Sequence, residues 1–338
     1  MKRYPSLLIT FSCFVMASGC GQSAGESAND ADAGASPDNA TMVPIPTYLS
    51  VMPGCAAAWV NWTAPTMPTG TTLTGYSVQR AATSAGPWTD VSTCSTTSRA
   101  NVESDVYGPK AQRAVTGCPA LSLTQGATYT FRVAAITKSS TGVISTGSWG
   151  FVTSTAIHTI NSNCDTWDIG PGGGELTYAS TTAFACGTTL TSQCHYLEVS
   201  PKLGKTTWCN NTVSNVPGAT GYTFGTGARN TLAMLTANGS FTGCTAGAAT
   251  LASSYRGGGL SDWFLPSQYD LRTVKNTVYD SLGTPLAPQF ITAVASGSWW
   301  SSTQGSFAPT AYAVTASGAI ATDVSKAYSY EVHAMRAF

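Results

Sequence analysis

The chain has 338 residues, a length that favours two folded domains, and only 9% of its residues are charged. Sixteen basic residues balance sixteen acidic ones and no basic stripe is present, so the sequence lacks the electrostatic footprint of a nucleic-acid-binding protein. Nine Trp, fourteen Tyr and eleven Phe, together with many Thr and Ser, favour short strands and tight turns. The composition predicts a mostly β globular protein with no nucleic-acid partner.

Residues 1–19 have the form of an export signal. A basic start precedes an apolar run from Leu7 to Ala17, which is shorter than the ~20 residues needed to span a bilayer. The segment resembles a bacterial lipoprotein signal, and this resemblance implies that Cys20 is lipidated after cleavage. Ala17 stands where that motif usually has Leu, and Ala17 with Gly19 also suits ordinary signal peptidase.

The number of cysteines favours the lipoprotein over an ordinary secreted protein. Cleavage before Cys20 removes Cys13 and leaves nine of the ten cysteines, and lipidation of Cys20 leaves an even set of eight for an oxidising compartment. Residues 21–40 contain no aromatic or large aliphatic side chain, so residues 20–44 are predicted to be a flexible acidic tether. We expect an exported protein at the cell surface, attached through a lipid anchor to the outer membrane if the source has two membranes.

Residues 45–155 show the alternation of short, half-buried strands. In YTFRVAAIT, Tyr129, Phe131, Val133 and Ala135 fall on one side, which is the period of a strand with one buried face. Further strands are predicted in AAWVNWTAP, LTGYSVQRA and PWTDVST, separated by Pro and Gly turns. Regular short strands with turn signals indicate an all-β sandwich.

The same region resembles a fibronectin type III domain. Trp62 in WVNWTAP resembles the buried tryptophan of the second strand, and LTQGATYTFRV resembles the tyrosine-corner segment with Tyr129 at the corner. The resemblance implies a fold and no function, and a spacer is the role that we expect for such a module.

Residues 156–338 mix strands with helices, which predicts an α+β domain. Helix formers occur in NTLAMLTAN, and a second helix is predicted over 245–256, ended by the three glycines of RGGGLSDWFLPS. A third helix follows in SQYDLRTVKNTVYDSL, where Ser267 and Asp270 form an SxxD capping box. Trp263 is interpreted as a core residue rather than as a stacking platform.

Six motifs in this region occur in one order, and they are IGPGGGELTY, CHYLEVSP, GTGARNTLAML, YRGGGLSDWFLPS, WWSST and the terminal VHAMRAF. Together they resemble the C-terminal domain of bacterial collagen-like adhesins, a C-type-lectin-like family that is widespread in proteins of unknown function. The resemblance implies a compact α+β domain whose terminal strands pair. It also implies binding to polysaccharide, although the collagen-like stalk is replaced here by the fibronectin-like module.

Metal sites and catalytic motifs are not recognisable in the sequence. The acidic triplets with which C-type lectins bind calcium are absent, and zinc ligation lacks a CxxC motif and has only His158, His195 and His333 to draw on. The formylglycine-generating enzymes use redox-active cysteines late in the chain, and no cysteine follows Cys244 here. The GxSxG motif of serine hydrolases and a local pair of glycosidase carboxylates are also absent. We expect no metal, no cofactor and no enzyme activity, and an enzyme related in fold to the formylglycine-generating enzymes is the less favoured alternative.

The eight cysteines after Cys20 are predicted to form disulfides that connect loop-rich segments. Three lie in the first domain and five in the second, and they are Cys55, Cys94, Cys118, Cys164, Cys186, Cys194, Cys209 and Cys244. Odd counts on both sides imply one bridge between the domains or free thiols. We expect Cys94 to pair with Cys118, and Cys55 to pair with a cysteine of the second domain such as Cys164.

The candidate ligand-binding residues are polar and aromatic residues of the family motifs, and they are Arg229, Asn230, Arg256, Asp262, Trp300, Ser301 and Ser302. Arginine forms bidentate bonds to carboxylate or sulfate, and an exposed indole can stack on a sugar. A structural role competes at each position, because Asn and Ser near turns usually satisfy backbone groups and paired Trp usually fill a core. The predicted function is an adhesin-like head that recognises a polysaccharide or a glycoprotein. The alternative is a scaffold of the cell envelope that binds another protein, and the sequence leaves the oligomeric state open.

Overall fold

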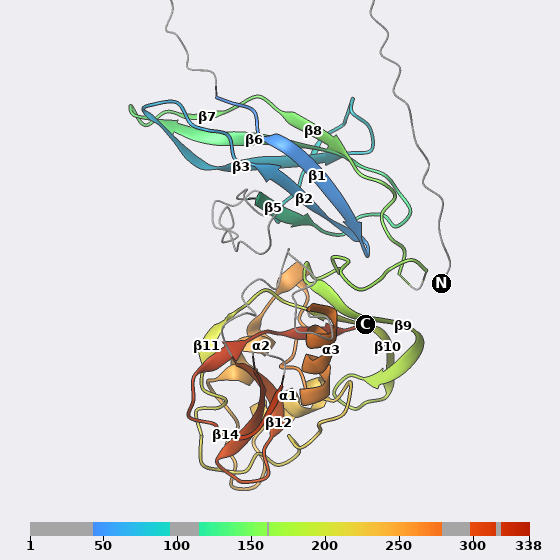
Figure 1. The fold of residues 1–338 in the computed structure, drawn as a ribbon, viewed down its shortest axis with the longest axis vertical. Helices are drawn as coiled ribbons and strands as arrows, with labels where there is room; N and C mark the ends of the chain where they lie inside the picture. The colour runs from blue at the N-terminus through green and yellow to red at the C-terminus, as the bar shows by residue number, and fades with distance from the viewer. Residues whose placement is uncertain (1–42, 95–114, 161, 279–297, 316–318) are drawn as a thin grey trace, which may run out of the picture. The chain divides into compact units, whose positions relative to one another are not determined.

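The structure is a computed structural model that describes residues 43–94, 115–160, 162–278, 298–315 and 319–338 (Figure 1). The export signal, Cys20 and nearly all of the tether therefore lie outside the described residues. By their contacts, residues 42–338 group into one compact unit. Among the helices of the described ranges, none has the length and apolar character that crossing a membrane requires.

Two antiparallel sheets form the first folded part, drawn blue to green in Figure 1. The first sheet has the order β1-β2-β5, from β1 (Thr47–Gly54), β2 (Ala57–Thr63) and β5 (Val115–Ala120). The second has the order β4-β3-β6-β7, from β3 (Thr71–Ala81), β4 (Thr89–Asp90), β6 (Thr130–Ser139) and β7 (Ile144–Thr146), and β8 (Gly150–Thr153) also pairs with β6. The predicted strands of the sandwich are all present.

The inner faces of these sheets share one hydrophobic core. Phe131, Val133 and Ala135 alternate along β6 into this core and pack with Trp62 of β2, which confirms the predicted facing of β6 and the predicted burial of Trp62. The Tyr129 hydroxyl accepts a hydrogen bond from the Thr124 N–H at 3.0 Å, so the tyrosine corner is formed. The alternation of the sequence thus sets which side chains the sandwich buries.

Residues after β8 remain packed on the sandwich. Ile157 is fully buried in the sandwich core, two residues beyond the boundary expected at residue 155. Further along, the Cys55 N–H donates to the Ile169 carbonyl at 2.8 Å, and Ile169 packs against Trp59 of β2. The two expected domains therefore share a packed junction, in keeping with their grouping into one compact unit.

The second folded part, referred to below as the head, contains two further sheets, drawn from green to red in Figure 1. The smaller sheet has the order β16-β10-β9, from β9 (Glu175–Cys186), β10 (Ser192–Val199) and β16 (Met335–Ala337). The larger has the order β11-β15-β12-β13-β14, from β11 (Gly204–Thr206), β12 (Trp299–Gln304), β13 (Thr310–Val314), β14 (Ile320–Ser325) and β15 (Tyr330–Val332). The first and last strands of the head both pair with β10. This corrects the expectation that the terminal strands pair with each other.

Within the described ranges three α-helices pack on these sheets, and they are α1 (Gly227–Leu235), α2 (Ala248–Ser254) and α3 (Gln268–Val278). The capping box of α3 is confirmed, because the Asp270 N–H donates to Ser267 Oγ at 3.2 Å and the Ser267 N–H donates to Asp270 Oδ2 at 2.8 Å. Helix α2 is shorter than the expected 245–256, and Gly257–Gly259 form a separate 3₁₀ turn after it. The last part of the expected third helix, beyond Val278, lies outside the described residues.

Four disulfides join the eight described cysteines, and they are Cys55–Cys164, Cys94–Cys118, Cys186–Cys194 and Cys209–Cys244. The structure thus contains both pairs that the sequence led us to expect. Cys55 and Cys164 are 109 residues apart in the chain, so in the chain-entropy view their bond restricts the unfolded chain most. For a loop of that length the stabilisation is about 5 kcal/mol.

Candidate functional site

Four of the candidate binding residues are fully buried and serve the fold, which corrects their assignment as ligand contacts: Asn230, Trp300, Ser301 and Ser302. The Trp300 indole N–H donates to the Thr206 carbonyl at 2.8 Å, and the Ser301 hydroxyl donates to the Tyr312 carbonyl at 2.9 Å. Asn230 accepts the Gly221 N–H at 3.1 Å and donates to Ser302 Oγ at 3.3 Å. Their polar groups form hydrogen bonds inside the head, which agrees with the structural role that competed with ligand binding at these positions.

The other three candidates, Arg229, Arg256 and Asp262, are exposed but are not brought together. Arg229 borders a pocket along α1 with a volume of about 590 Å³, whereas Arg256 lines a different cleft. Asp262 accepts two hydrogen bonds from Arg336 Nε, at 2.7 and 2.8 Å. A single site built from all three is therefore ruled out by their positions.

Two glycine-rich loops pack directly on each other below Arg256. A Cβ on Gly257 would lie 2.7 Å from the Gly172 carbonyl, and one on Gly258 would lie 2.6 Å from the Pro171 carbonyl, so neither position has room for a side chain. Gly258 also has a φ of +65°, in the left-handed region that glycine adopts without strain. The three glycines of RGGGLSDW thus serve close backbone packing as well as the end of a helix.

A buried carboxylate holds the other glycine loop from beneath. Glu198 of β10 is fully buried and accepts the Gly172 N–H at 3.2 Å and the Gly174 N–H at 2.7 Å. Arg336 Nη1 lies 3.6 Å from Glu198 Oε2, which makes an ion pair but is too long for a hydrogen bond. Burial raises the pKa of Glu198 to about 7, against the opposing effect of these donors and of Arg336.

Residues from four of the six ordered sequence motifs therefore lie close together. The loop of IGPGGGELTY, Glu198 of CHYLEVSP, Asp262 of RGGGLSDW and Arg336 of VHAMRAF form a continuous chain of polar contacts. Trp263 fills the space beside them and donates its indole N–H to the Gly257 carbonyl at 3.1 Å. Its burial confirms that it is a core residue.

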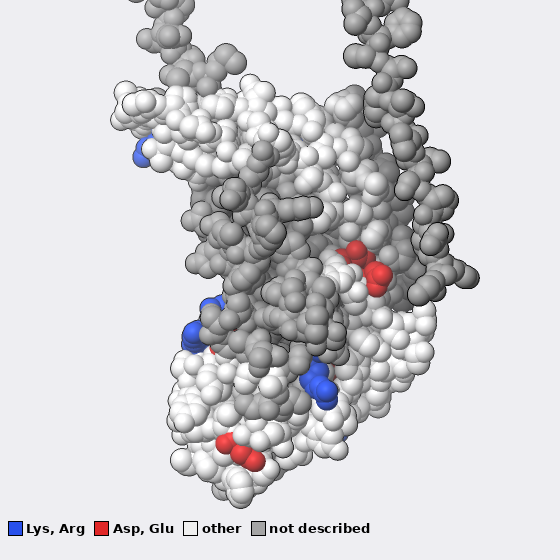
Figure 2. Space-filling model, viewed as in Figure 1, with Lys and Arg blue, Asp and Glu red and all other residues white. Residues whose placement is uncertain are grey.

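An open cleft of about 550 Å³ lies over the two glycine loops. Arg256 and Gly257–Gly259 contribute to its lining from the head, and Arg80 and Asp90 contribute from the sandwich. Arg80 Nη1 donates to the Leu121 carbonyl at 3.1 Å, which orients the guanidinium beside the cleft. Charged side chains are few and scattered on the molecular face drawn in Figure 2, so two arginines in one cleft are a local concentration of positive charge.

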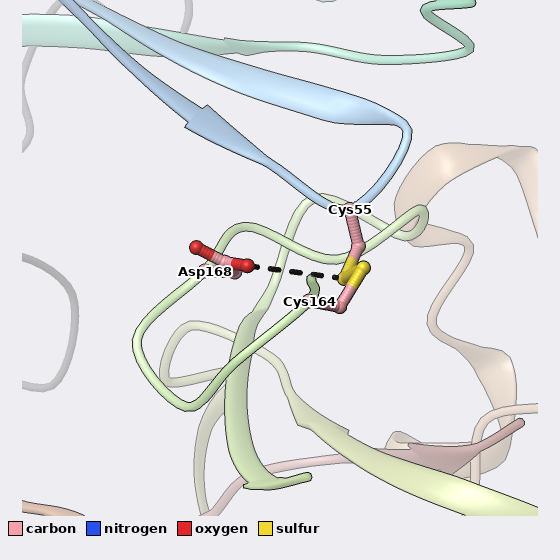
Figure 3. A group of neighbouring side chains, drawn as sticks. All are labelled: Cys55, Cys164 and Asp168. Atoms are coloured by element: carbon pink, nitrogen blue, oxygen red, sulfur yellow. Dashed lines mark hydrogen bonds between the residues drawn. A yellow bond between two sulfur atoms is a disulfide. The ribbon is translucent and has the colours of Figure 1, made fainter. Parts of the chain in front are cut away.

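One group of potential metal ligands occurs among the described residues, and Figure 3 shows it as Cys55, Cys164 and Asp168. Asp168 Oδ2 lies 4.0 Å from Cys55 Sγ and 2.6 Å from His158 Nδ1. Because both sulfurs belong to a disulfide, neither is a thiolate that could bind a metal ion, and Cys55 Sγ has no proton to donate to Asp168. In this oxidised state the group acts as a covalent link between the sandwich and the segment that precedes the head.

Sequence reasoning missed several buried ionisable residues in the head. Glu175 has no hydrogen-bond partner for Oε2 within the described ranges, and burial raises its pKa to about 8. Burial lowers the pKa of His333 to about 4, and its ring stacks on Trp299 with centroids 3.9 Å apart. Lys326 is buried as well, and its ammonium donates to three oxygens, including the Ser214 carbonyl at 2.8 Å. For Glu198 the available signal was its position inside a strand, in HYLEV, whereas Lys326 and His333 each lie one residue beyond a strand.

Comparison with known proteins gives no family. No family model and no curated protein matches the chain. Similar solved structures include the sixth fibronectin type III domain of human fibronectin type III domain containing protein 3, at 19% identity and a TM-score of 0.24, covering 36% of this chain and 92% of that one. Another is the fourth FNIII domain of a human protein, at 17% identity, a TM-score of 0.22, and 37% and 92% coverage.

The twitchin kinase region from C. elegans is also similar, at 14% identity and a TM-score of 0.23. That match covers 35% of this chain, and this chain spans only 17% of the twitchin structure. TM-scores this low do not establish a shared fold. The sandwich is defined instead by its own two sheets and their common core.

Arg336→Met tests the contacts beneath the glycine loops. The substitution leaves Glu198 buried without its positive partner. We expect the free energy of unfolding at pH 8 to fall by about 1 kcal/mol, which is the cost of protonating at pH 8 a carboxyl whose pKa is about 7. At pH 5 the loss should be much smaller, because the folded carboxyl, whose pKa is already raised, is then protonated and uncharged. Urea unfolding at both pH values provides the measurement, and Asp262→Asn is the matched control that removes only the exposed partner. An equal loss at pH 5 and pH 8 would contradict this role for Glu198.

Glu175→Gln tests the buried carboxyl whose Oε2 has no hydrogen-bond partner within the described ranges. Its folded pKa of about 8 lies above the unfolded value of 4.5, so between these values the unfolded state loses the proton first and the stability of the wild type falls as pH rises. We expect the variant to melt with the wild type at pH 5 and several degrees higher at pH 8.5, as followed by scanning calorimetry. A variant that is destabilised at both pH values would show that Glu175 makes an essential contact instead.

Proposed function

We propose that the chain is an exported lipoprotein whose head binds an acidic polysaccharide or the acidic glycan of a glycoprotein. The observation that carries this proposal is the cleft lined by Arg80, Arg256 and the glycines 257–259. Arginine presents a planar fork of donors that matches carboxylate and sulfate groups. Gly259 of this loop leaves room for a ligand to approach the backbone, because a Cβ at this position would meet no atom within 4 Å.

The orientation of Arg256 supports this use. Its Nη1 donates to the Ser253 and Tyr255 carbonyls, at 2.7 Å each, which holds the exposed guanidinium over the cleft. Neither Arg256 nor Arg80 forms an ion pair with a carboxylate among the described residues. Asp90 shares the cleft, so the net positive charge is small and binding at one site should be modest.

The fold proposed for residues 156–338 is that of a C-type-lectin-like domain. Support comes from its mixed α+β content, from β16 next to β10, and from the convergence of the ordered motifs on one polar network. Export is supported by four disulfides in the described chain, because such bonds persist in oxidising compartments. Anchorage at the cell surface through Cys20 remains part of the proposal.

Substitutions in the cleft provide the binding test. Heparin, polygalacturonate and neutral dextran serve as sulfated, carboxylated and uncharged polymers in titration calorimetry. We expect Arg256→Ala and Arg80→Ala each to weaken binding of an acidic polymer by about tenfold, the loss of one charge-assisted interaction. Arg229→Ala, which changes an exposed arginine outside the cleft, should bind as the wild type does.

Affinity should fall as salt rises, because exposed charges are screened beyond ~8 Å at physiological ionic strength. Chelation of calcium should have no effect. Equal binding of dextran, loss of binding with a chelator, or unchanged affinity of both cleft variants would contradict the proposal. An absence of binding to every glycan would favour the envelope scaffold.

Cys20→Ser tests attachment to the membrane. The substitution removes the only residue that the signal motif presents for lipidation, so we expect the protein to move from the membrane fraction to the medium. Fractionation and immunoblotting of cells that express either form measure this change. Wild-type protein that is found in the medium without a lipid would show that ordinary signal peptidase cleaves the chain.

A further inference from the structure

The outer face of the second sheet of the sandwich carries a ladder of aromatic rings and an arginine. Asp90, Gln79, Arg132 and Phe151 are direct neighbours across β4, β3, β6 and β8, so their side chains form one row on one face. The core residues of β6 lie one position away, on the opposite face. The row is therefore an outward-facing feature of the sandwich.

Two tryptophans flank the arginine of this row. The Arg132 guanidinium carbon lies 4.2 Å from the ring centroid of Trp88 and 4.2 Å from that of Trp149, which is cation–π distance for both rings. Phe151 continues the series, with its ring centroid 5.8 Å from that of Trp88, and 54% of its surface is exposed. These rings lie outside the hydrophobic core, so core packing does not account for them. Exposed clusters of large apolar side chains often mark interaction sites.

The hydrogen bonds in the row leave part of the guanidinium for a ligand. Gln79 donates from Nε2 to Asp90 Oδ1 at 2.8 Å, and its Oε1 accepts from Arg132 Nε at 2.8 Å and from Nη2. Within the described ranges the guanidinium uses Nε and Nη2 alone, and no carboxylate pairs with it. The Arg132 guanidinium is therefore held between two indole rings, and its Nη1 has no hydrogen-bond acceptor among the described residues.

We propose that this ladder, formed by Trp88, Arg132, Trp149 and Phe151, is a second binding surface for an acidic polysaccharide. The apolar faces of pyranose rings would lie on the exposed aromatic rings, and a carboxylate or sulfate group would meet the free edge of Arg132. The unpaired positive charge favours an acidic sugar over a neutral one. The sandwich would then be a binding module rather than the spacer that the sequence led us to expect.

This proposal does not rest on the cleft, because no residue of the ladder lines it. Two contacts along one polymer would act together, and linked sites raise the affinity for a long chain well above that for a short one. The cleft and the ladder can therefore be separated by substitutions and by the length of the ligand.

Phe151→Ala in the full chain is the test variant, because an exposed ring can be removed with little cost to folding. Its matched control is Ile144→Ala, which removes a side chain that is 67% exposed on β7 of the same sheet. We expect Phe151→Ala and Arg132→Gln each to weaken binding of long heparin or polygalacturonate chains by at least fivefold, with the control unchanged. The same polymers should change the tryptophan fluorescence of the wild type and of Arg256→Ala, which keeps the ladder intact.

Unchanged affinity and fluorescence in Phe151→Ala and Arg132→Gln would overturn the proposal and leave the ladder a purely stabilising feature of the sheet. Dextran that binds as tightly as the charged polymers would overturn the role of Arg132. Self-association that is lost in Phe151→Ala, without any change in sugar binding, would show that the rings contact a second copy of the chain. Binding of heparin but not of polygalacturonate would support the proposal with sulfate as the required group, because heparin carries both groups. Binding of both polymers would support it with carboxylate as sufficient.

Discussion

The arrangement of the head depends on one buried carboxylate. Glu198 accepts two backbone N–H groups from the glycine loop before β9 and faces Arg336 of the last strand, so a single side chain connects three segments that are distant in sequence. The carboxylate is fully desolvated, and removing its partners would cost more than removing the whole network. The second glycine loop, which forms part of the cleft, rests on the first. The position of Arg256 therefore depends indirectly on the fully buried side chain of Glu198.

Local patterns predicted the elements of this fold well, because each depends on few neighbouring residues. The alternation around Phe131 and the capping box of Ser267 and Asp270 are short-range signals that tertiary packing did not override. The strand order at the end of the chain was not predictable in the same way. Pairing of β16 with β10 depends on contacts between residues more than a hundred positions apart. Periodicity indicates which face of a strand is buried and does not indicate its partner.

The candidate site was only partly predictable, for a related physical reason. Arg256 could be chosen because it precedes three glycines, which let a ligand approach the backbone closely, and it does line a cleft. Ser301 and Trp300 have the same residue types as many sugar contacts, yet both are fully buried and bond to backbone carbonyls. Arg80 escaped notice because its relevance arises only where the sandwich meets the head. The ladder escaped for the same reason, since Trp88 and Trp149 come together through strand pairing.

Because so few residues are charged, the exposed arginines would contribute more to the recognition of an anionic ligand than they would on a protein surface rich in charge. With 9% charged residues, the chain has no broad electrostatic field to attract a polyanion from a distance. Recognition would then depend on short-range geometry, as in the guanidinium of Arg132 held between two indole rings or that of Arg256 held by two carbonyls. Such sites are individually weak, and a repeating polymer is the kind of ligand that can occupy several of them at once. If the two proposed surfaces both bind, the chain would suit an extended glycan better than a small free sugar.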